Sequence, residues 1–289
     1  ATLYIDDLFA LFSAKSIPAL GLLMNKYMKR IERWSNLHYQ EMEPAKSHLI
    51  LFARPKPNQT LPPILLNNIQ IPTTQQITLL GLIIGHKLSF HQHVAYALRR
   101  AAARIAGAYQ LSSRTRGFKM IHCRSLAIAQ ILPVIDYGST VWYKTGRSKG
   151  LIAKINQVQL KLVVWITGAY KMTGLQPLEV ESFMLPTQLR LTRRAFKKLA
   201  LLLTAPSSHP LHQAVSSSIT SPPTKLLSPL DISIAAFPLL ISLDLEVITF
   251  SPIPPWIDPT PPNIDVAADK DIAITEHLKI AESNPNTNL

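Results

Sequence analysis

The first twelve residues of the chain predict a β-hairpin with two carboxylates at its turn. Asp6 and Asp7 lie between two apolar runs, residues 3–5 and 8–12. Asp is common in tight turns because its side chain hydrogen-bonds the nearby backbone. Two carboxylates at a hairpin tip offer oxygen ligands to a divalent cation, as phosphoryl transfer requires. A plain surface turn has the same pattern, so the residues that follow decide between the two interpretations.

A long amphipathic helix is predicted after the hairpin, over residues 16–39. Ser16 can cap this helix, Pro18 lies in its first turn, and an apolar stripe follows at helical spacing. The stripe consists of Leu20, Leu23, Met24, Tyr27, Ile31 and Trp34. Pro44-Ala45-Lys46 then breaks the helix, and residues 47–52 predict a buried strand. We expect residues 1–54 to form a small antiparallel sheet with the helix on one face, in the order that closes a polymerase palm.

This order of elements and three later motifs resemble the reverse transcriptases of non-LTR (LINE-type) retrotransposons, particularly the fungal ones. The motifs are Leu80-Gly81 with Leu88, Phe90 and His93, then Pro133 with Tyr137-Gly138 and Trp142, then Gln159 with Ile166, Gly168 and Ala169. With the hairpin they extend over residues 1–205. Gly85 departs from the pattern, because the family usually has Asp there.

The resemblance implies an RNA-directed DNA polymerase that copies RNA into DNA by two-metal nucleotidyl transfer. Asp6 and Asp7 would be catalytic ligands of Mg²⁺ or Mn²⁺, and Tyr4 would pack beneath the primer end. Lys46 matches the family's Pro-x-Lys position, where it would be a general acid for pyrophosphate release. A charge at the entry of a strand explains Lys46 equally well. Leu80-Gly81 occupies the region that grips the primer, where Gly permits close backbone approach.

Charge is distributed unevenly along the chain. Residues 1–205 carry 27 Lys and Arg against 8 Asp and Glu, whereas residues 206–289 carry 3 against 9. A body this basic is typical of a protein that binds a polyanion. The implied partners are an RNA template and a DNA primer, paired as an RNA–DNA duplex, and deoxynucleoside triphosphates in the full-length parent. A solvated surface of a basic globular protein is the alternative.

Four helices are predicted in the middle of the chain. They cover residues 93–111, 119–132 ending at Pro133, 148–167 ending at Gly168, and 187–204. Cations gather off their apolar faces: Arg100 and Arg104 on the first, Lys154 and Lys161 on the third, and Arg190, Arg193, Arg194 and Lys197 on the fourth. By the resemblance these helices form a thumb that grips a duplex through its shape and backbone charge. For any single cation, a solvated face is an equally good interpretation.

The predicted fold class is α+β. Residues 1–90 would be part of a palm, residues 91–205 a helical thumb, and residues 206–289 an acidic, poorly ordered linker with one helix at 267–282. The last segment contains 13 of the 23 prolines and no arginine, a composition typical of linkers. In the family this position leads to an RNase H domain, and no segment of that kind is recognisable here.

Two further parts of such a polymerase are also not recognisable in the sequence, namely the fingers and another palm carboxylate. We therefore expect a fragment that does not polymerise alone. The alternative from another functional class is a non-catalytic basic nucleic-acid-binding protein, or a retroelement relic without a selected function. An intact Asp6-Asp7 pair favours the enzyme lineage.

Several other classes of protein are excluded by the sequence. Cys123 is the single cysteine, which rules out an internal disulfide framework and any Cys-x-x-Cys zinc knuckle. Residues 232–250 are the most apolar late stretch, but they contain Pro238, Asp244 and Glu246 and make a poor membrane span. No signal peptide is visible. By the resemblance we expect an intracellular protein, in a nuclear or cytoplasmic ribonucleoprotein.

Overall fold

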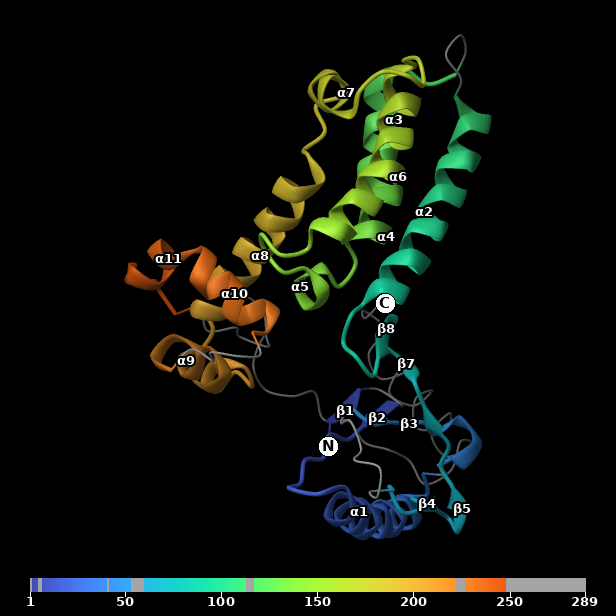
Figure 1. Cartoon of the computed structure of the whole chain (residues 1–289), viewed down its shortest axis with the longest axis vertical. Coiled ribbons are helices and arrows are strands. Elements are labelled where there is room, and N and C mark those ends of the chain that lie inside the picture. Colours follow the sequence, from blue (N-terminus) through green and yellow to red (C-terminus); the bar gives the residue numbers. More distant parts are fainter. Residues whose placement is uncertain are drawn as a thin grey trace, which may run out of the picture. The chain divides into compact units, whose positions relative to one another are not determined.

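The computed structural model describes residues 2–4, 7–40, 42–52, 60–112, 117–221 and 227–247. The chain divides into two compact units, residues 1–245 and 246–289, and all the described helices and strands belong to the first. In the described residues, helices accompany four two-stranded sheets (Figure 1). This mixture is compatible with the predicted α+β class.

The predicted N-terminal hairpin is confirmed. Strand β1 (Thr2–Tyr4) pairs antiparallel with β2 (Asp7–Phe9), and the register places Tyr4 opposite Asp7. Residues 5 and 6, and with them Asp6, lie outside the described residues. Asp7 is the first residue of the returning strand.

Helix α1 (Ile17–Leu37) confirms the helix predicted after the hairpin. The hydroxyl of Ser16 accepts a hydrogen bond of 3.4 Å from the amide of Ala19, which satisfies one of the free donors of the first turn. Asn25 then ties α1 to the next segment, because its side-chain amide donates to the carbonyl of Pro63 at 3.0 Å and accepts from the amide of Leu65 at 3.1 Å. A small hydrophobic core packs α1 against the segment that follows it. Its buried side chains are Met24 of α1, Leu49, Ile64, Leu66 and Ile71.

The strands after α1 differ from the expected single antiparallel sheet. Strand β3 (Leu49–Ile50) covers only part of the predicted strand and pairs parallel with β6 (Thr73–Thr74). Strands β4 (Leu65–Leu66) and β5 (Ile69–Gln70) form a separate hairpin. The sequence missed these pairings because a strand of two residues is too short to show alternating hydrophobicity.

A third hairpin leads into the helical part. Strands β7 (Gln76–Leu79) and β8 (Leu82–Gly85) pair antiparallel around a turn formed by Leu80 and Gly81. Both turn residues have positive φ, 46° and 78°, the combination that a type I′ turn needs. Helix α2 (His91–Leu111) follows, and its buried residues are His93, Val94, Ala97, Ala101, Ile105 and Ala108.

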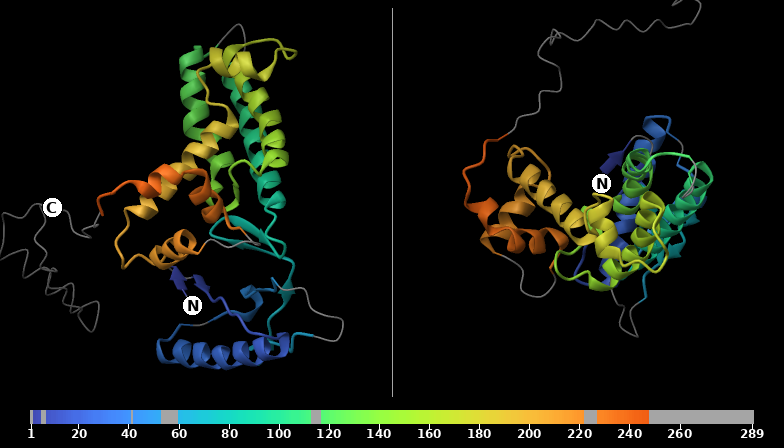
Figure 2. Two further views of the ribbon diagram at one scale, coloured as in Figure 1. Left: turned by 60° about the vertical axis from the view of Figure 1, so that its left-hand side comes forward. Right: turned by 90° about the horizontal axis from the view of Figure 1, so that it is seen from above.

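The helical part is built around α2 and α6 (Lys149–Thr167), which contact each other along their lengths (Figures 1 and 2). Helices α7 (Leu175–Glu181) and α8 (Thr187–Leu203) pack against α6, and the short helix α5 (Ser139–Trp142) packs against α8. The fully buried side chains between the helices include Ala101, Ile131, Ile155, Leu162 and Leu191. Gly168 caps α6 in the left-handed conformation, with φ of 68°, as predicted.

The helix predicted to end at Pro133 instead continues through it. Helix α3 (Met120–Leu126) runs into a π-helical segment (Ala127–Ile131), and α4 (Leu132–Asp136) carries Pro133 in its first turn. A proline inside a helix clashes with the carbonyl four residues earlier. The wider π turn ahead of Pro133 relieves this clash, so the chain continues as a helix.

Residues 206–247 also differ from the linker that the sequence predicted. They contain α9 (His212–Thr220), α10 (Pro229–Ala236) and α11 (Pro238–Ser242), and α10 contacts α8 and α9. Pro229 and Pro238 lie in first turns, where a missing N–H costs nothing. The hydroxyl of Ser228 caps α10 in a reciprocal pair with Asp231. The helix predicted at 267–282 lies outside the described residues.

Candidate nucleic-acid interface

The carboxylate pair at the N-terminal hairpin is described only in part. The backbone pairing of Tyr4 with Asp7 is present, whereas Asp6 and the side chains of Tyr4 and Asp7 lie outside the described residues. Lys46 ends a single turn of 3₁₀-helix, η1 (Pro44–Lys46), and is exposed. In the described part of the chain, no group of three or more His, Cys, Asp or Glu residues could hold a metal ion.

The turn between β7 and β8 is held by Tyr137. The Tyr137 hydroxyl donates a hydrogen bond of 2.6 Å to the carbonyl oxygen of Leu80. A Cβ added to Gly81 would lie 3.4 Å from the Tyr137 ring, so the turn and the ring are in contact. Gly138, with φ of 60°, approaches the hairpin more closely still, since a Cβ there would lie 2.4 Å from Cδ2 of Leu82.

His93, on α2, contacts both strand β8 and the segment after α4. Its Nδ1 accepts from the amide of Ile83 in β8 at 3.4 Å, and its Nε2 lies 3.4 Å from the carbonyl oxygen of Tyr137. The indole of Trp142 donates to that same carbonyl at 3.0 Å. With Nδ1 as the acceptor, the ring is neutral and Nε2 carries the proton. Burial lowers the pKa of His93, against an opposing effect of the Tyr137 carbonyl, which agrees with a neutral ring.

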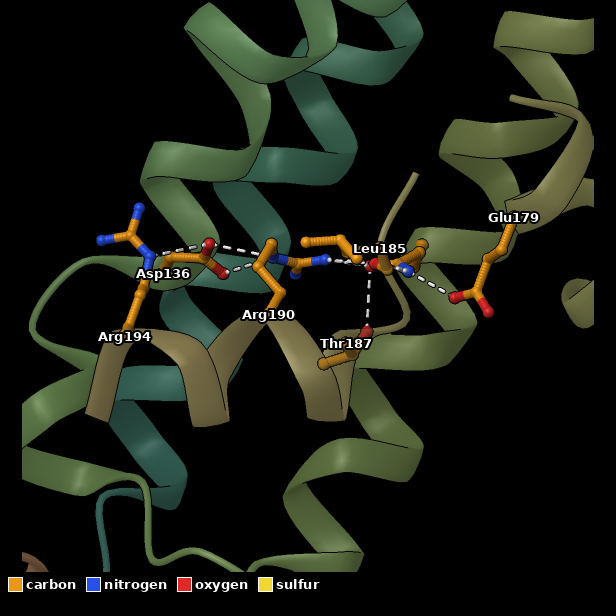
Figure 3. Close-up of polar contacts among 7 residues, drawn as sticks. Asp136, Glu179, Leu185, Thr187, Arg190 and Arg194 are labelled. Carbon is orange, nitrogen blue, oxygen red and sulfur yellow. Dashed lines mark hydrogen bonds and ion pairs between the residues drawn. The ribbon is translucent and has the colours of Figure 1, made fainter. Parts of the chain in front are cut away.

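A buried polar network crosses α4, α6 and α8 (Figure 3). The guanidinium of Arg190 donates from Nε to both carboxylate oxygens of Asp136, at 2.9 and 3.2 Å, and from Nη1 to Oε1 of Gln159 at 2.6 Å. Arg194 lies 3.2 Å from the same carboxylate. Because Asp136 is only 1% exposed, these two cations balance a charge that would otherwise be costly to bury.

Gln159 extends this network towards α7. Its Oε1 also accepts from the hydroxyl of Thr187 at 2.9 Å, and its amide donates to Glu179 and, at 3.1 Å, to the carbonyl of Leu185. Burial raises the pKa of Glu179, while the hydrogen bond from Gln159 and the charge of Arg190 act in the opposite direction. Every atom of the Gln159 amide group that can make a hydrogen bond is therefore used inside the protein.

The network gives Arg190 a different environment from the one that the sequence indicated. The sequence grouped it with Arg193, Arg194 and Lys197 on one side of a helix, whereas Arg190 is buried and the other three are exposed. Arg194 keeps part of its side chain in solvent while it contacts Asp136. Arg190 thus belongs to the core in the described structure.

The other cations singled out from the sequence are exposed. Arg100 lies over the ring of Tyr96 with 5.6 Å between Cζ and the ring centroid, and Arg104 donates to the carbonyl of Gln130. Lys154 and Lys161 lie on the exposed side of α6. Residues 80–204 contain 19 Lys and Arg but three acidic residues, and two of these, Asp136 and Glu179, are buried. The charged groups of this part that are not buried are therefore almost all cationic.

Sequence reasoning singled out Leu80 and Gly81, but neither the turn that they form nor the residues that position it. Tyr137 and His93 were noted as parts of motifs, without a role. A signal was available for Asp136, because a lone acid between apolar residues of a helix needs a buried cationic partner. The choice of Arg190 as that partner requires the packing of α8 on α4, which no local pattern shows.

Over 139 residues the chain is 24% identical to a probable RNA-directed DNA polymerase from transposon X-element of Drosophila melanogaster. The matched segment covers 48% of this chain and 15% of that polymerase. No protein-family model matches the sequence. No solved structure matches it either. None of the helices in the described ranges is long and apolar enough to span a bilayer.

Proposed function

We propose that this chain is part of an RNA-directed DNA polymerase of a non-LTR retrotransposon, similar to the fungal ones, and that its helical part holds an RNA–DNA duplex. The observation that carries the proposal is the charge of residues 80–204, which contain 19 Lys and Arg and three acidic residues, two of them buried. A duplex of phosphates complements such a surface. The similarity to a transposon polymerase supports the same conclusion.

In this proposal residues 1–90 are part of a palm, residues 91–205 a thumb, and residues 206–289 the connection beyond it. The exposed cations Arg100, Arg104, Lys154, Lys161 and Arg194 contact phosphates of the duplex. Such contacts fix the position of the nucleic acid without reading its sequence. Arg190 has a supporting role, since it orders α8 from the core through Asp136.

The turn between β7 and β8 contacts the primer strand. Leu80 is 46% exposed, and Gly81 has no side chain that would keep a sugar–phosphate backbone away. Tyr137 prevents the turn from moving, because its hydroxyl holds the Leu80 carbonyl at 2.6 Å. A turn fixed in this way approaches the primer without losing conformational entropy when it binds.

The carboxylates of Asp6 and Asp7 are the proposed ligands of Mg²⁺ or Mn²⁺, and their hard oxygen atoms suit either ion. The ion, when bound, would neutralise charge on the phosphates during nucleotidyl transfer. The β1–β2 hairpin pairs the backbone of Asp7 with that of Tyr4. In this proposal Tyr4 supports the primer end, and Lys46 supplies a proton to the leaving pyrophosphate. Two carboxylates are fewer than a two-metal centre needs. We therefore propose that this chain alone binds primer–template without extending it.

The proposal is tested with the whole chain and a fluorescein-labelled 20-base-pair RNA–DNA duplex, followed by anisotropy. Two duplexes of unrelated sequence should bind with equal affinity, and unlabelled duplex should compete with both. The same reaction with deoxynucleoside triphosphates and Mg²⁺ should give no primer extension. Failure to bind either duplex at low salt would refute the thumb, whereas extension of the primer would refute the inactivity of this chain.

A further inference from the structure

Helix α1 carries two stacked pairs of planar side chains at its surface. The guanidinium of Arg30 lies over the ring of Tyr27, with 5.4 Å between Cζ and the ring centroid. The indole of Trp34 stacks on the ring of His38, with the centroids 4.7 Å apart and 26° between the planes. Tyr27 and Trp34 are 37% and 39% exposed, so both pairs reach solvent. The four residues follow at spacings of three, four and four, which places them on one face of the helix.

Both pairs are held in place by other contacts within the protein. Nδ1 of His38 donates a hydrogen bond of 2.9 Å to the carbonyl oxygen of Trp34, and this bond keeps the imidazole against the indole. The ring of Tyr27 meets that of Phe12 edge to face, with 5.1 Å between the centroids. Side chains that are already ordered lose little conformational entropy when a ligand binds. The face is therefore a preformed stacking surface.

The exposed charges of α1 are all positive. Four of its cations are exposed, namely Lys26, Lys29, Arg30 and Arg33. The single acid of the helix, Glu32, is half-buried, and its carboxylate accepts a hydrogen bond of 2.6 Å from the amide of Asn67. The stacked rings thus lie among cations that complement phosphates.

We propose that this face of α1, formed by Tyr27, Arg30, Trp34 and His38, binds single-stranded nucleic acid. Unpaired bases stack on aromatic rings and on guanidinium planes, while neighbouring cations follow the phosphates. Neither contact reads the base or the sugar, so RNA and DNA of any sequence should bind with similar affinity. This inference goes beyond the proposed duplex binding, because it uses residues of α1 rather than residues 80–204.

Tryptophan fluorescence of the whole chain tests the stacking directly. Trp142 and Trp165 are only 3% and 5% exposed, so a bound strand should quench mainly Trp34. The measurement uses Trp256→Phe, which removes the tryptophan that lies outside the described residues. In this background a 12-nucleotide strand should quench the fluorescence. Adding Trp34→Phe keeps a ring for stacking, so binding should persist while the quenching is lost. Undiminished quenching in that variant would overturn the inference.

The affinity for the same strand, measured by anisotropy, should depend on the ring of Trp34. Trp34→Ala should lower it about tenfold, as expected for the loss of one base stack. Leu22→Ala is the matched control, because Leu22 is an exposed apolar side chain of α1 that cannot stack on a base, and the affinity should not change. An abasic strand of equal length should bind the wild-type chain about tenfold more weakly than the strand with bases. Circular dichroism checks that each variant is folded.

The cations of α1 should contribute through the phosphates. Arg30→Gln with Arg33→Gln should reduce the dependence of the logarithm of single-strand affinity on the logarithm of salt concentration by about 1.4 units, if each arginine contacts one phosphate. Trp34→Ala should leave the affinity for a blunt RNA–DNA duplex unchanged, because paired bases already stack on one another. Duplex binding and single-strand binding can therefore fail independently.

Three results would overturn the inference. The first is equal affinity of the wild-type chain and Trp34→Ala for the single strand, and the second is equal affinity of the wild-type chain for the abasic strand and the strand with bases. The third comes from sedimentation of the chain without nucleic acid. A dimer that dissociates in Trp34→Ala would assign this face of α1 to a second copy of the chain instead.

Discussion

The hydroxyl of Tyr137 donates a hydrogen bond to the carbonyl oxygen of Leu80, with an O–O distance of 2.6 Å across 57 residues of sequence. This bond connects the segment after α4 to a turn in which Leu80 and Gly81 both have positive φ. A leucine with positive φ is strained and persists only where its surroundings hold it. Tyr137 is therefore the residue that keeps the β7–β8 turn in its conformation.

Tyr137→Phe should loosen this turn without removing the ring that packs on it. Because Tyr137 is 49% exposed, water can replace the lost hydrogen bond in part, and we expect a loss of about 0.5 kcal/mol in the free energy of unfolding. Urea denaturation measures this loss, and hydrogen exchange should show faster exchange at β7 and β8. Exchange unchanged in these strands would mean that the turn does not depend on the hydroxyl.

Gly138→Ala should be much more disruptive than a comparable change elsewhere. The new methyl group would lie 2.4 Å from Leu82 and would also sit on a residue with φ of 60°. Gly146→Ala is the matched control, because Gly146 has φ of 73° but an added Cβ meets nothing within 4 Å. In the control, backbone strain alone should lower the free energy of unfolding by about 1 kcal/mol. Gly138→Ala should lower it by about 2 kcal/mol more, because the added methyl group also clashes with Leu82. Equal losses in thermal denaturation would contradict the close approach.

The sequence predicted the long helices well and the short strands poorly, for physical reasons. The helices α1, α2, α6 and α8 show a continuous apolar stripe, so their positions could be predicted within a few residues. Strands β3 and β6 have two residues each and carry no periodic signal. Pro133 marked a helix end by local rules, and only the π-helical turn before it explains why the helix continues.

In the candidate interface, the sequence predicted the exposed cations but not the buried one. Exposed cations such as Lys154 and Lys161 follow from helical periodicity, because they lie opposite the apolar face of α6. Arg190 occupies a position that looks equivalent on α8, yet its burial depends on Asp136 of another helix. Local patterns do not show which cation meets a buried acid, so Arg190 could not be separated from its neighbours by sequence.

Arg190→Met should destabilise the protein strongly. The substitution leaves Asp136 buried with only the partly exposed Arg194 beside it, and it removes a donor from Gln159. We expect a loss of about 3 kcal/mol in the free energy of unfolding. Arg193→Met, at an exposed position of the same helix, should change it by less than about 0.5 kcal/mol. Adding Asp136→Asn to Arg190→Met should recover part of the loss, and no recovery would show that the charge of Asp136 is not the cause.

His93 should make stability fall in mild acid. Burial lowers its pKa in the folded state below the ordinary value of 6.5, so the unfolded chain binds the proton more readily. The free energy of unfolding should therefore be highest above pH 6.5 and decrease as the pH drops through and below it. Urea denaturation between about pH 5 and 8 measures this, and His93→Gln should flatten the dependence. His122→Gln, on an exposed histidine, serves as the control.

The salt dependence of duplex binding tests the central claim most directly. The logarithm of the affinity of the whole chain for an RNA–DNA duplex should fall linearly with the logarithm of the salt concentration, because bound counterions are released. Lys154→Gln with Lys161→Gln should reduce the slope by about two units if each lysine contacts one phosphate. Lys26→Gln with Lys29→Gln removes the same charge from the exposed side of α1 and should leave the slope unchanged. A wild-type slope near zero, or equal effects of the two double variants, would contradict a thumb that grips the duplex.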